Sequence, residues 1–259
     1  EQIYFKILNH AYEITLEKNL CISGGVGLNA LANGKIYTNT PFQNIHIFGP
    51  AGDSGGALGA ALHTYSHILG QKPPKKAILG LSWGTSYTDG DIDALLQKEK
   101  LKYKRFTDEK ELIETTAQLL AKNNLVGWFQ GRMEFGPRAL GNRSILANPK
   151  PASMKEKMNR IKKRELYRPF ACSILEEKVH EYFELPEHTS FPFMNFCFIV
   201  KKEKRQNLKA VVHADNTCRI QTIQAETNPR YYKLITAFEK LTGIPALMNT
   251  SSNLNHEPI

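Results

Sequence analysis

The segment from Val126 to Pro149 alternates glycine with arginine directly after a short apolar stretch. Its glycines and arginines are Gly131, Gly136, Gly141, Arg132, Arg138 and Arg143. Glycine lets a backbone approach a ligand closely, and the guanidinium group offers a planar fork of donors to an oxyanion. The pattern favours a loop that holds a phosphate or a carboxylate. For any single arginine, an ordinary loop with a solvated side chain is the alternative.

A second basic segment, from Lys155 to Arg168, has seven lysines and arginines in fourteen residues. Together with the net charge of +9, it indicates an anionic partner, either a nucleic acid or a small phosphorylated substrate. No interleaving of aromatic and basic residues follows, and part of these charges is expected to solvate a helix face. The sequence therefore disfavours a nucleic acid and favours a small phosphorylated ligand.

Two glycine-rich turns near the N-terminus each follow a short apolar stretch and precede a helical one. The expected strands are 20–23 and 45–48, the turns 24–29 and 49–56, and the helices begin at 30 and 57. A strand, a glycine turn and a helix aim backbone N–H groups at whatever lies above the turn. Neither turn is a Walker loop or a GxGxxG motif, so they indicate α/β architecture without naming a ligand.

The remaining pattern predicts helices and strands around a linker at 70–88. Expected helices are 2–18, 89–98, 108–122, 155–165 and 228–242, and expected strands are 125–129, 197–200, 210–213 and 245–248. The chain has 259 residues, 41% hydrophobic and 23% charged, which is typical of a globular protein. Four cysteines without a CxxC pair, no long apolar run and no secretory signal predict a cytoplasmic location and no membrane partner.

Taken together, the motifs resemble the NodU/CmcH family of O-carbamoyltransferases over nearly the whole chain. The resemblance rests on GWFQGRMEFGPRALGNRSILANP (127–149), NRIKKRELYRPFA (159–171), HADNTCRIQTI (213–223) and TGIPALMNTSSN (242–253), with GGVGLN (24–29) and GPAGDSGGALGAA (49–61) upstream. Several long motifs in the same order form a specific signal.

The resemblance implies an α/β enzyme with two modules. Residues 1–70 resemble the tail of an actin/hsp70-type ATPase-like domain that transfers the carbamoyl group, and 71–88 are the linker. Residues 89–259 resemble the twisted-sheet domain of threonylcarbamoyl-adenylate synthase. In the family, carbamoyl phosphate and ATP give carbamoyl adenylate, and the carbamoyl group then moves to a hydroxyl of a sugar or antibiotic precursor. We expect the chain to be a fragment, because the family's upstream HxxxH metal motif is missing and its members continue past Pro258.

Candidate ligand contacts follow from the basic motifs and from the resemblance. The catalytic candidates are Arg138, Lys162, Arg164 and His213. The further contacts expected for carbamoyl phosphate and ATP are Arg143, Arg168, Arg219, Asn249, Ser251 and Asn253. Lys162 and Arg164 resemble the Lys-x-Arg pair of the adenylate synthase fold, and 249–253 resembles its Ser-x-Asn motif. Alternation from 213 to 219 would place His213 and Arg219 on one face of a strand.

The N-terminal motifs imply a second set of residues. Gly24, Gly25 and Asn29 match the family's nucleotide loop, and Asp53 matches its metal-ligating aspartate. Mg²⁺ is expected with ATP. Iron belongs to the full-length family and is expected to be weak or absent in this chain, since one carboxylate does not hold a metal. His63 and His67 have a chelating spacing but lie outside the family's metal position, so we interpret them as a coincidence.

The sequence departs from the family pattern at Cys172, Asn216, Ser252 and His256, where the family usually has Pro, Gly, Phe and Gly. Asn216 is a mild departure, because asparagine tolerates the left-handed conformation that a glycine supplies. Ser252 and His256 put the geometry of 249–257 in doubt, but not the fold. A non-catalytic ligand-binding remnant, an RNA-binding or tRNA-modifying protein, and a threonylcarbamoyl-adenylate synthase stay open as alternatives. The hydroxyl acceptor and the oligomeric state, a homo-oligomer included, stay open too.

Overall fold

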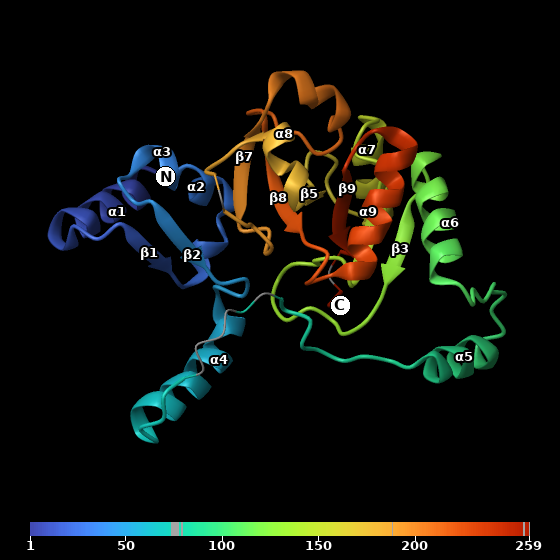
Figure 1. Ribbon diagram of the computed structural model, residues 1–259, viewed down its shortest axis with the longest axis horizontal. Coiled ribbons are helices and arrows are strands. Elements are labelled where there is room, and N and C mark those ends of the chain that lie inside the picture. Colours follow the sequence, from blue (N-terminus) through green and yellow to red (C-terminus); the bar gives the residue numbers. More distant parts are fainter. Residues whose placement is uncertain (74–77, 79, 188, 256, 259) are drawn as a thin grey trace.

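The computed structural model describes residues 1–73, 78, 80–187, 189–255 and 257–258, and these form an α/β protein built on two sheets. A small N-terminal unit lies beside a larger unit that holds the main sheet (Figure 1). The predicted α/β fold class is thereby confirmed. No helix in the described ranges has the length and apolar character that crossing a membrane would require.

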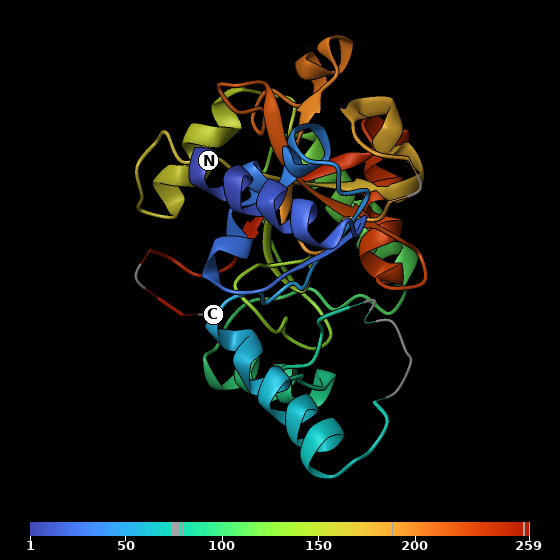
Figure 2. The ribbon, with the colours of Figure 1, turned by 90° about the vertical axis from the view of Figure 1, so that its left-hand side faces the viewer.

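The N-terminal unit contains a two-stranded parallel sheet of β1 and β2. Its elements are α1 (Gln2–Thr15), β1 (Asn19–Ile22), α2 (Ala30–Gly34), α3 (Ile36–Asn39), β2 (Asn44–Ile47) and α4 (Asp53–His63). Because β1 and β2 are parallel, both glycine turns follow the same edge of this sheet. Helix α4 continues through a π-helical turn, Thr64–Ile68, and projects away from the rest of the chain (Figures 1 and 2).

The main sheet has seven strands in the order β3-β4-β9-β5-β8-β7-β6 among the described residues. Its strands are β3 (Val126–Phe129), β4 (Arg143–Ala147), β5 (Ala171–Leu175), β6 (Phe183–Glu184), β7 (Phe196–Val200), β8 (Thr217–Ile223) and β9 (Ala246–Ser251). Only the β5–β8 pair is parallel, so the sheet is mixed. One face is unusually polar, since the register places Ser144, Ser173, Arg219, Gln221 and Asn249 on it.

Helices pack against the main sheet and share its hydrophobic core. The helices of the larger unit are α5 (Asp89–Lys98), α6 (Glu109–Ala121), α7 (Ser153–Ile161), α8 (Val179–Tyr182) and α9 (Pro229–Thr242). Helices α6 and α9 pack against each other, as Figure 1 shows, and α9 also lies against β5 and β9. Leu120 from α6 and Phe238 from α9 are fully buried in the shared core.

The two units are joined through buried backbone contacts. Asn33 is fully buried and donates its amide to the carbonyl oxygens of Gly27 (2.8 Å) and Asn195 (2.9 Å). Asn195 in turn donates to the carbonyl of Phe48 (3.0 Å). Gly34 lies so close to strand β7 that a Cβ atom there would clash with the carbonyl of Cys197. Helix α2 therefore sits directly on the strand backbone.

Most predicted elements are present, with their ends shifted. Helix α5 spans the predicted 89–98, and α9 ends at Thr242 as predicted, where Gly243 closes it in a left-handed conformation. Helix α4 begins at Asp53 instead of 57, so Gly55 and Gly56 of the predicted turn belong to the helix, whereas Gly49 and Gly52 precede it. Helix α7 spans Ser153–Ile161, so the predicted 155–165 is wrong at its C-terminal end. The predicted strand 210–213 is wrong, because turns occupy 210–211 and the next strand begins at Thr217.

Part of the predicted linker pairs with the glycine-arginine loop. Residues 74–77 and 79 lie outside the described residues, but Leu81 is buried and the stretch 81–85 runs alongside 131–135. Gly84 donates to the carbonyl of Met133 (2.8 Å), and Met133 donates to that of Thr85 (2.9 Å). Residues 81–85 therefore pack along the edge of the larger unit, whereas the sequence predicted a linker here.

Candidate functional site

A buried carboxylate folds the glycine-arginine loop. The Oε1 atom of Glu134 accepts hydrogen bonds from the backbone N–H groups of Leu140 (2.6 Å), Asn142 (2.8 Å) and Arg143 (3.3 Å). The side chain is only 8% exposed. One oxygen thus gathers three amides from the far end of the loop, which bends residues 134–143 back on themselves.

Arg143 holds the same loop from the other side. Its two terminal nitrogens donate to the carbonyl oxygens of Gln130 (2.7 Å), Asn142 (3.0 Å), Gly131 (3.0 Å) and Thr85 (3.1 Å). The guanidinium group also lies over the ring of Phe129, 3.7 Å from its centre. All four terminal N–H donors have acceptors, so the predicted phosphate contact is corrected to a structural role.

Asn249 is a structural residue as well. It is 1% exposed, and its amide donates to Ser173 Oγ (3.0 Å), Gln221 Oε1 (3.3 Å) and the carbonyl of Ala139 (3.5 Å). Gln221 donates to the next carbonyl, that of Leu140 (2.8 Å). The amide of Asn249 therefore helps to fix the loop onto the polar face of the sheet. Its Oδ1 has no hydrogen-bond partner among the described residues, and its nucleotide contact stays a prediction.

Two arginines of this region have no acidic partner. Arg138, at the tip of the loop, makes one long hydrogen bond, from Nη2 to the carbonyl of Leu28 (3.3 Å), and its Nε has no partner in the described ranges. Arg219, on the polar face of β8, makes no hydrogen bond or ion pair with any described side chain or backbone group, and its Nε is buried. Burial, and then the charge of Arg219, lowers the pKa of Arg138 to about 10. Burial also lowers the pKa of Arg219.

Arg164 extends this cationic cluster. Its Nε donates to Asn159 Oδ1 (2.6 Å), and its guanidinium group lies 4.4 Å from the centre of the Phe170 ring. Burial lowers its pKa, and the charges of Arg168 and Arg219 act in the same direction. Arg168 is exposed and paired with Glu165 (2.6 Å), which places it at the rim of the cluster rather than inside it.

His213 lies beside the cluster, but it belongs to a turn and not to the predicted strand. The predicted alternation fails because residues 213–216 form a turn with Asn216 in the left-handed conformation, at φ 65°. The imidazole nevertheless returns to the strand, where its Nδ1 lies 3.0 Å from Thr217 Oγ1. Burial lowers the pKa of His213, so the ring is neutral near pH 7. Asparagine at 216 fits this turn, as the sequence predicted.

Lys162 holds the segment that follows β9. Its ammonium group donates to the carbonyl oxygens of Ser251 (2.6 Å) and Asn253 (2.5 Å), and the residue is 4% exposed. Burial, and then the charge of Arg164, lowers the pKa of Lys162 to about 8. Lys162 is therefore a positioning residue for the two polar residues predicted to contact the nucleotide.

A groove of about 570 Å³ connects these parts. It is lined by the loop from Met133 to Arg138, by Ser251 and Asn253 after β9, and by Ser54 at the start of α4. The groove thus brings together three predicted site residues, Arg138, Ser251 and Asn253, and borders the N-terminal unit. His256, whose effect on this segment was in doubt, lies outside the described residues.

The pKa of Lys162 leads to a test by titration. In the unfolded chain an ordinary lysine keeps its proton up to about pH 10.4, whereas folded Lys162 loses it near pH 8. Burial of the ammonium group therefore lowers the free energy of unfolding by its full amount below pH 8. This loss of stability disappears above the ordinary pKa of lysine. Compared with Lys162→Met, the wild type should gain free energy of unfolding as the pH rises from 8 to 10. A constant difference between the two proteins over that range would contradict the assignment.

The predicted residues of the N-terminal unit also lie together. Gly24 donates its N–H to the carbonyl of Ala51 (2.7 Å), so the two glycine turns are in contact, with Gly25 beside Gly52. Asn29 caps helix α2 by accepting from the N–H of Ala32 (3.2 Å), which gives it a structural role in place of a ligand contact.

Asp53 lies exposed in the first turn of α4, next to these glycines. No cluster of three or more His, Cys, Asp and Glu side chains suited to a metal ion occurs within the described residues. The residues present therefore do not fit a tightly held metal ion.

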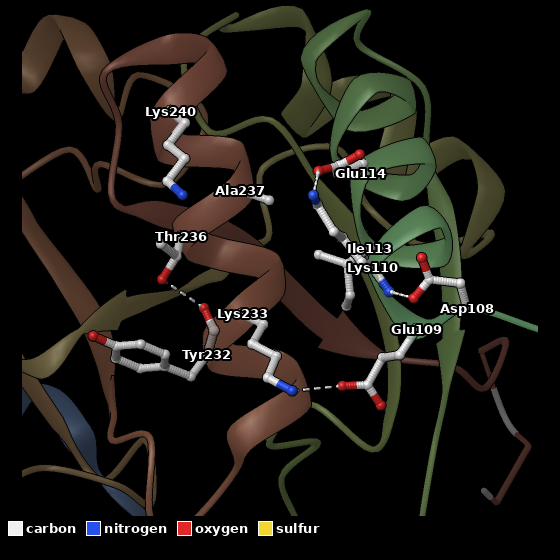
Figure 3. A pocket seen from close by; sticks show the side chains of 10 residues that line it. All are labelled: Asp108, Glu109, Lys110, Ile113, Glu114, Tyr232, Lys233, Thr236, Ala237 and Lys240. Atoms are coloured by element: carbon white, nitrogen blue, oxygen red, sulfur yellow. Dashed lines mark hydrogen bonds and ion pairs between the residues drawn. The ribbon is translucent and has the colours of Figure 1, made fainter.

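A second groove, of about 490 Å³, lies between α6 and α9 and contains none of the predicted residues. Figure 3 shows that its charged side chains face one another: Glu109 pairs with Lys233 (2.8 Å), and Lys110 lies 3.9 Å from Glu114. These two pairs match four of its charged side chains, and none of the predicted residues lines it, so we do not assign a ligand to it.

Glu134 and Thr217 are the residues that sequence reasoning missed. Glu134 is the one carboxylate in the segment from Val126 to Pro149, and that isolation among glycines was the available signal. Thr217 carried no signal, because its role depends on a turn that brings His213 back to the strand.

Fold and site together define an α/β protein with a cationic cluster in which Arg138 and Arg219 have no acidic partner among the described residues. Arg138 also lines the groove, so the arrangement is suited to an anionic ligand. Residues 117–259 match the family described as Carbamoyltransferase C-terminus, and residues 1–62 match Carbamoyltransferase N-terminus. The chain belongs to the carbamoyltransferase family.

The chain is similar to longer proteins. It is 46% identical to nodulation protein NolNO of Sinorhizobium fredii and 43% identical to nodulation protein NolO of Bradyrhizobium diazoefficiens, in both cases over its whole length. It covers 38% and 47% of these relatives, so it spans less than half of each. Among solved structures, full-length HypF in its phosphate- and nucleotide-bound form matches 60% of this chain and 19% of its own, with 21% identity and a TM-score of 0.43. A double variant of Sua5 from P. abyssi matches 57% of this chain and 40% of its own, with 16% identity and a TM-score of 0.41.

Proposed function

We propose that this chain contributes the carbamoyl-activating part of an O-carbamoyltransferase and that its arginine cluster binds carbamoyl phosphate and ATP. One observation carries the proposal: Arg138 and Arg219 are adjacent and partly buried, and neither has an acidic partner among the described residues. Placing two positive charges side by side away from water is unfavourable. An anionic ligand with several oxygens removes that cost, because each guanidinium group can then donate charge-assisted hydrogen bonds.

The chemistry follows from the family. Carbamate, released from carbamoyl phosphate by hydrolysis with loss of phosphate, attacks the α-phosphorus of ATP through an oxygen atom. The bond to the β-phosphate breaks, and pyrophosphate leaves with carbamoyl adenylate as the product. A hydroxyl oxygen of the acceptor then takes the carbamoyl group, and AMP leaves. The protein's part in activation is to position the two anions and to neutralise their charge; we propose no covalent intermediate.

Each cation has a place in this scheme. Arg138 and Arg219 hold phosphate oxygens, Arg164 supports them from across the cluster, and Arg168 meets the ligand at the rim. Lys162 acts indirectly, because it positions Ser251 and Asn253 at the groove. ATP is bound as its Mg²⁺ complex. We assign no step to iron, the metal expected in the full-length family, because Asp53 belongs to no group of three or more His, Cys, Asp and Glu side chains among the described residues.

The division into residues 1–70, 71–88 and 89–259 is part of the proposal, with residues 81–85 of the middle segment packed against the last part. A hydroxylated small molecule as the acceptor is part of it too. The relatives' names refer to nodulation, which we carry over no further than a hydroxyl of a sugar or natural product. The N-terminal unit, with Gly24, Gly25 and Asp53 along one edge, is the side from which the acceptor would approach.

The test is calorimetric titration of the folded chain with carbamoyl phosphate and with ATP and Mg²⁺, followed by an assay for pyrophosphate. We expect both ligands to bind and pyrophosphate to form only when both are present. Binding without pyrophosphate would support the alternative of a non-catalytic ligand-binding remnant. A folded chain that binds neither ligand would contradict the proposal.

A further inference from the structure

The imidazole of His213 is held in one orientation beside the arginine cluster. Its Nδ1 lies 3.0 Å from Thr217 Oγ1 on β8. Thr217 and Arg219 are two residues apart on that strand, so their side chains lie on the same face, about 7 Å from each other along the strand. The ring is therefore adjacent to the cationic site, although its residue belongs to a turn.

The hydrogen bonds of Thr217 decide which ring nitrogen carries the proton. Its hydroxyl lies 2.7 Å from Asp215 Oδ1, and its backbone N–H donates to the same oxygen (3.0 Å). Burial raises the pKa of Asp215, but the hydrogen bonds from Thr217 outweigh that effect and hold the pKa below its usual range, so the group is an acceptor-only carboxylate. The single hydroxyl proton of Thr217 thus goes to Asp215. The threonine oxygen can then only accept from His213, which makes Nδ1 the protonated nitrogen.

The other nitrogen, Nε2, is consequently a bare acceptor. It is buried and has no hydrogen-bond partner among the described residues. The charged side chains that act on the ring are Arg219 and Lys155, which are cations, and Asp215, which is already hydrogen-bonded. A hydrogen bond with the backbone of Phe170 raises the pKa of His213 and so opposes the effect of burial, while Nε2 itself has no hydrogen-bond partner among the described residues. The cluster therefore offers many donors to a ligand's oxygens and, at His213, one acceptor.

We infer that His213 Nε2 accepts a hydrogen bond from the –NH₂ group of the carbamoyl ligand and so selects carbamoyl phosphate over acyl phosphates that lack an N–H. This inference rests on the proposed function of the arginine cluster. It makes His213 a specificity-determining residue, with Thr217 and Asp215 as positioning residues that fix the imidazole tautomer. A buried acceptor left without a donor is costly, so a methyl group in place of the –NH₂ is rejected.

The test compares three ligands on the intact chain: carbamoyl phosphate, acetyl phosphate and inorganic phosphate. We expect the wild type to bind carbamoyl phosphate about tenfold more tightly than acetyl phosphate, as one hydrogen bond predicts. His213→Ala should reduce that preference to less than twofold and leave the affinity for inorganic phosphate within about twofold. Thr217→Val, which removes the hydroxyl without changing the shape of the side chain, should lower the preference partway.

A second readout does not depend on ligand. Nitrogen NMR of the free wild type should show His213 protonated at Nδ1 and bare at Nε2, with the signal identified by its loss in His213→Ala, and Thr217→Val should mix the tautomers. A proton at Nε2 in the wild type would overturn the inference. So would equal affinity for carbamoyl and acetyl phosphate, a result that leaves the proposed function standing. Failure to bind any of the three ligands would overturn both.

Discussion

Replacing Arg219 with alanine is expected to weaken the binding of carbamoyl phosphate about 100-fold without lowering the free energy of unfolding. The loss corresponds to two charge-assisted hydrogen bonds. Stability is preserved because Arg219 has no protein partner among the described residues, and removing it relieves the repulsion on Arg138. Arg138→Ala should also weaken the binding of carbamoyl phosphate. Its free energy of unfolding should be less well preserved than that of Arg219→Ala, because the hydrogen bond to the Leu28 carbonyl is lost.

Two control variants make this prediction specific. Arg160→Ala removes the same charge from an exposed site, where Glu156 is the partner of the side chain among the described residues, and should change affinity less than twofold. Arg143→Ala should show the opposite behaviour, a large loss of stability, because four carbonyl oxygens lose the guanidinium donor and only those of Thr85 and Asn142 keep a backbone donor among the described residues. If Arg219→Ala lowers stability yet binds the ligand normally, the unpaired arginine is structural and the site lies elsewhere. Calorimetry and urea unfolding on the same preparations give both quantities.

Glu134→Ala should lower the free energy of unfolding by about 3 kcal/mol, because three backbone N–H groups lose their common acceptor in a buried loop. Ligand binding should be lost in the same variant, since Arg138 is carried by the loop that Glu134 folds. Urea unfolding followed by tryptophan fluorescence measures the change, and the buried Trp128 reports on the adjacent strand.

The matched variants separate charge from shape. Glu134→Gln keeps one oxygen acceptor and should cost about 1 kcal/mol. Glu114→Ala, at an exposed site 3.9 Å from Lys110, should cost less than about 0.5 kcal/mol. Equal stability of Glu134→Ala and Glu114→Ala would show that the loop is held by other contacts.

The sequence predicted the type of site better than the members of the site. Arg138 and Arg143 are the same residue type, five positions apart in one loop, and no local pattern distinguishes them. The two arginines differ in their partners: Arg143 also donates to the carbonyl of Thr85, which belongs to the stretch expected to be a linker. Asn249 was predicted to contact the ligand because of a motif, but its position opposite Ala171 in the sheet buries it beneath the loop. The periodicity of apolar residues along a sequence does not show which distant segments will pair.

The fold was predictable where local chemistry is strong. Thr88 and Asp91 form a capping box, and helix α5 starts where that signal places it. Strands β4 and β5 were missed because Arg143, at the start of β4, and Pro169, just before β5, are typical of loops. Both strands also pair with β9, which lies far away in the sequence. The turn at His213 was predicted wrongly for a related reason. Alternation of residues along a segment does not show that part of the segment is a turn whose side chain packs back against the strand.

The pairing of residues 81–85 with the loop has a consequence for dividing this chain into parts. Arg132 donates to the carbonyl oxygens of Trp83 and Gly84, Arg143 donates to that of Thr85, and the Leu81 side chain packs in the core with Leu140. A cut at the natural-looking boundary before Asp89 would leave two arginines without these acceptors and expose an apolar patch under the loop. The module that carries the arginine cluster therefore begins, as a physical unit, no later than Leu81, and a shortened gene for it should start upstream of that leucine.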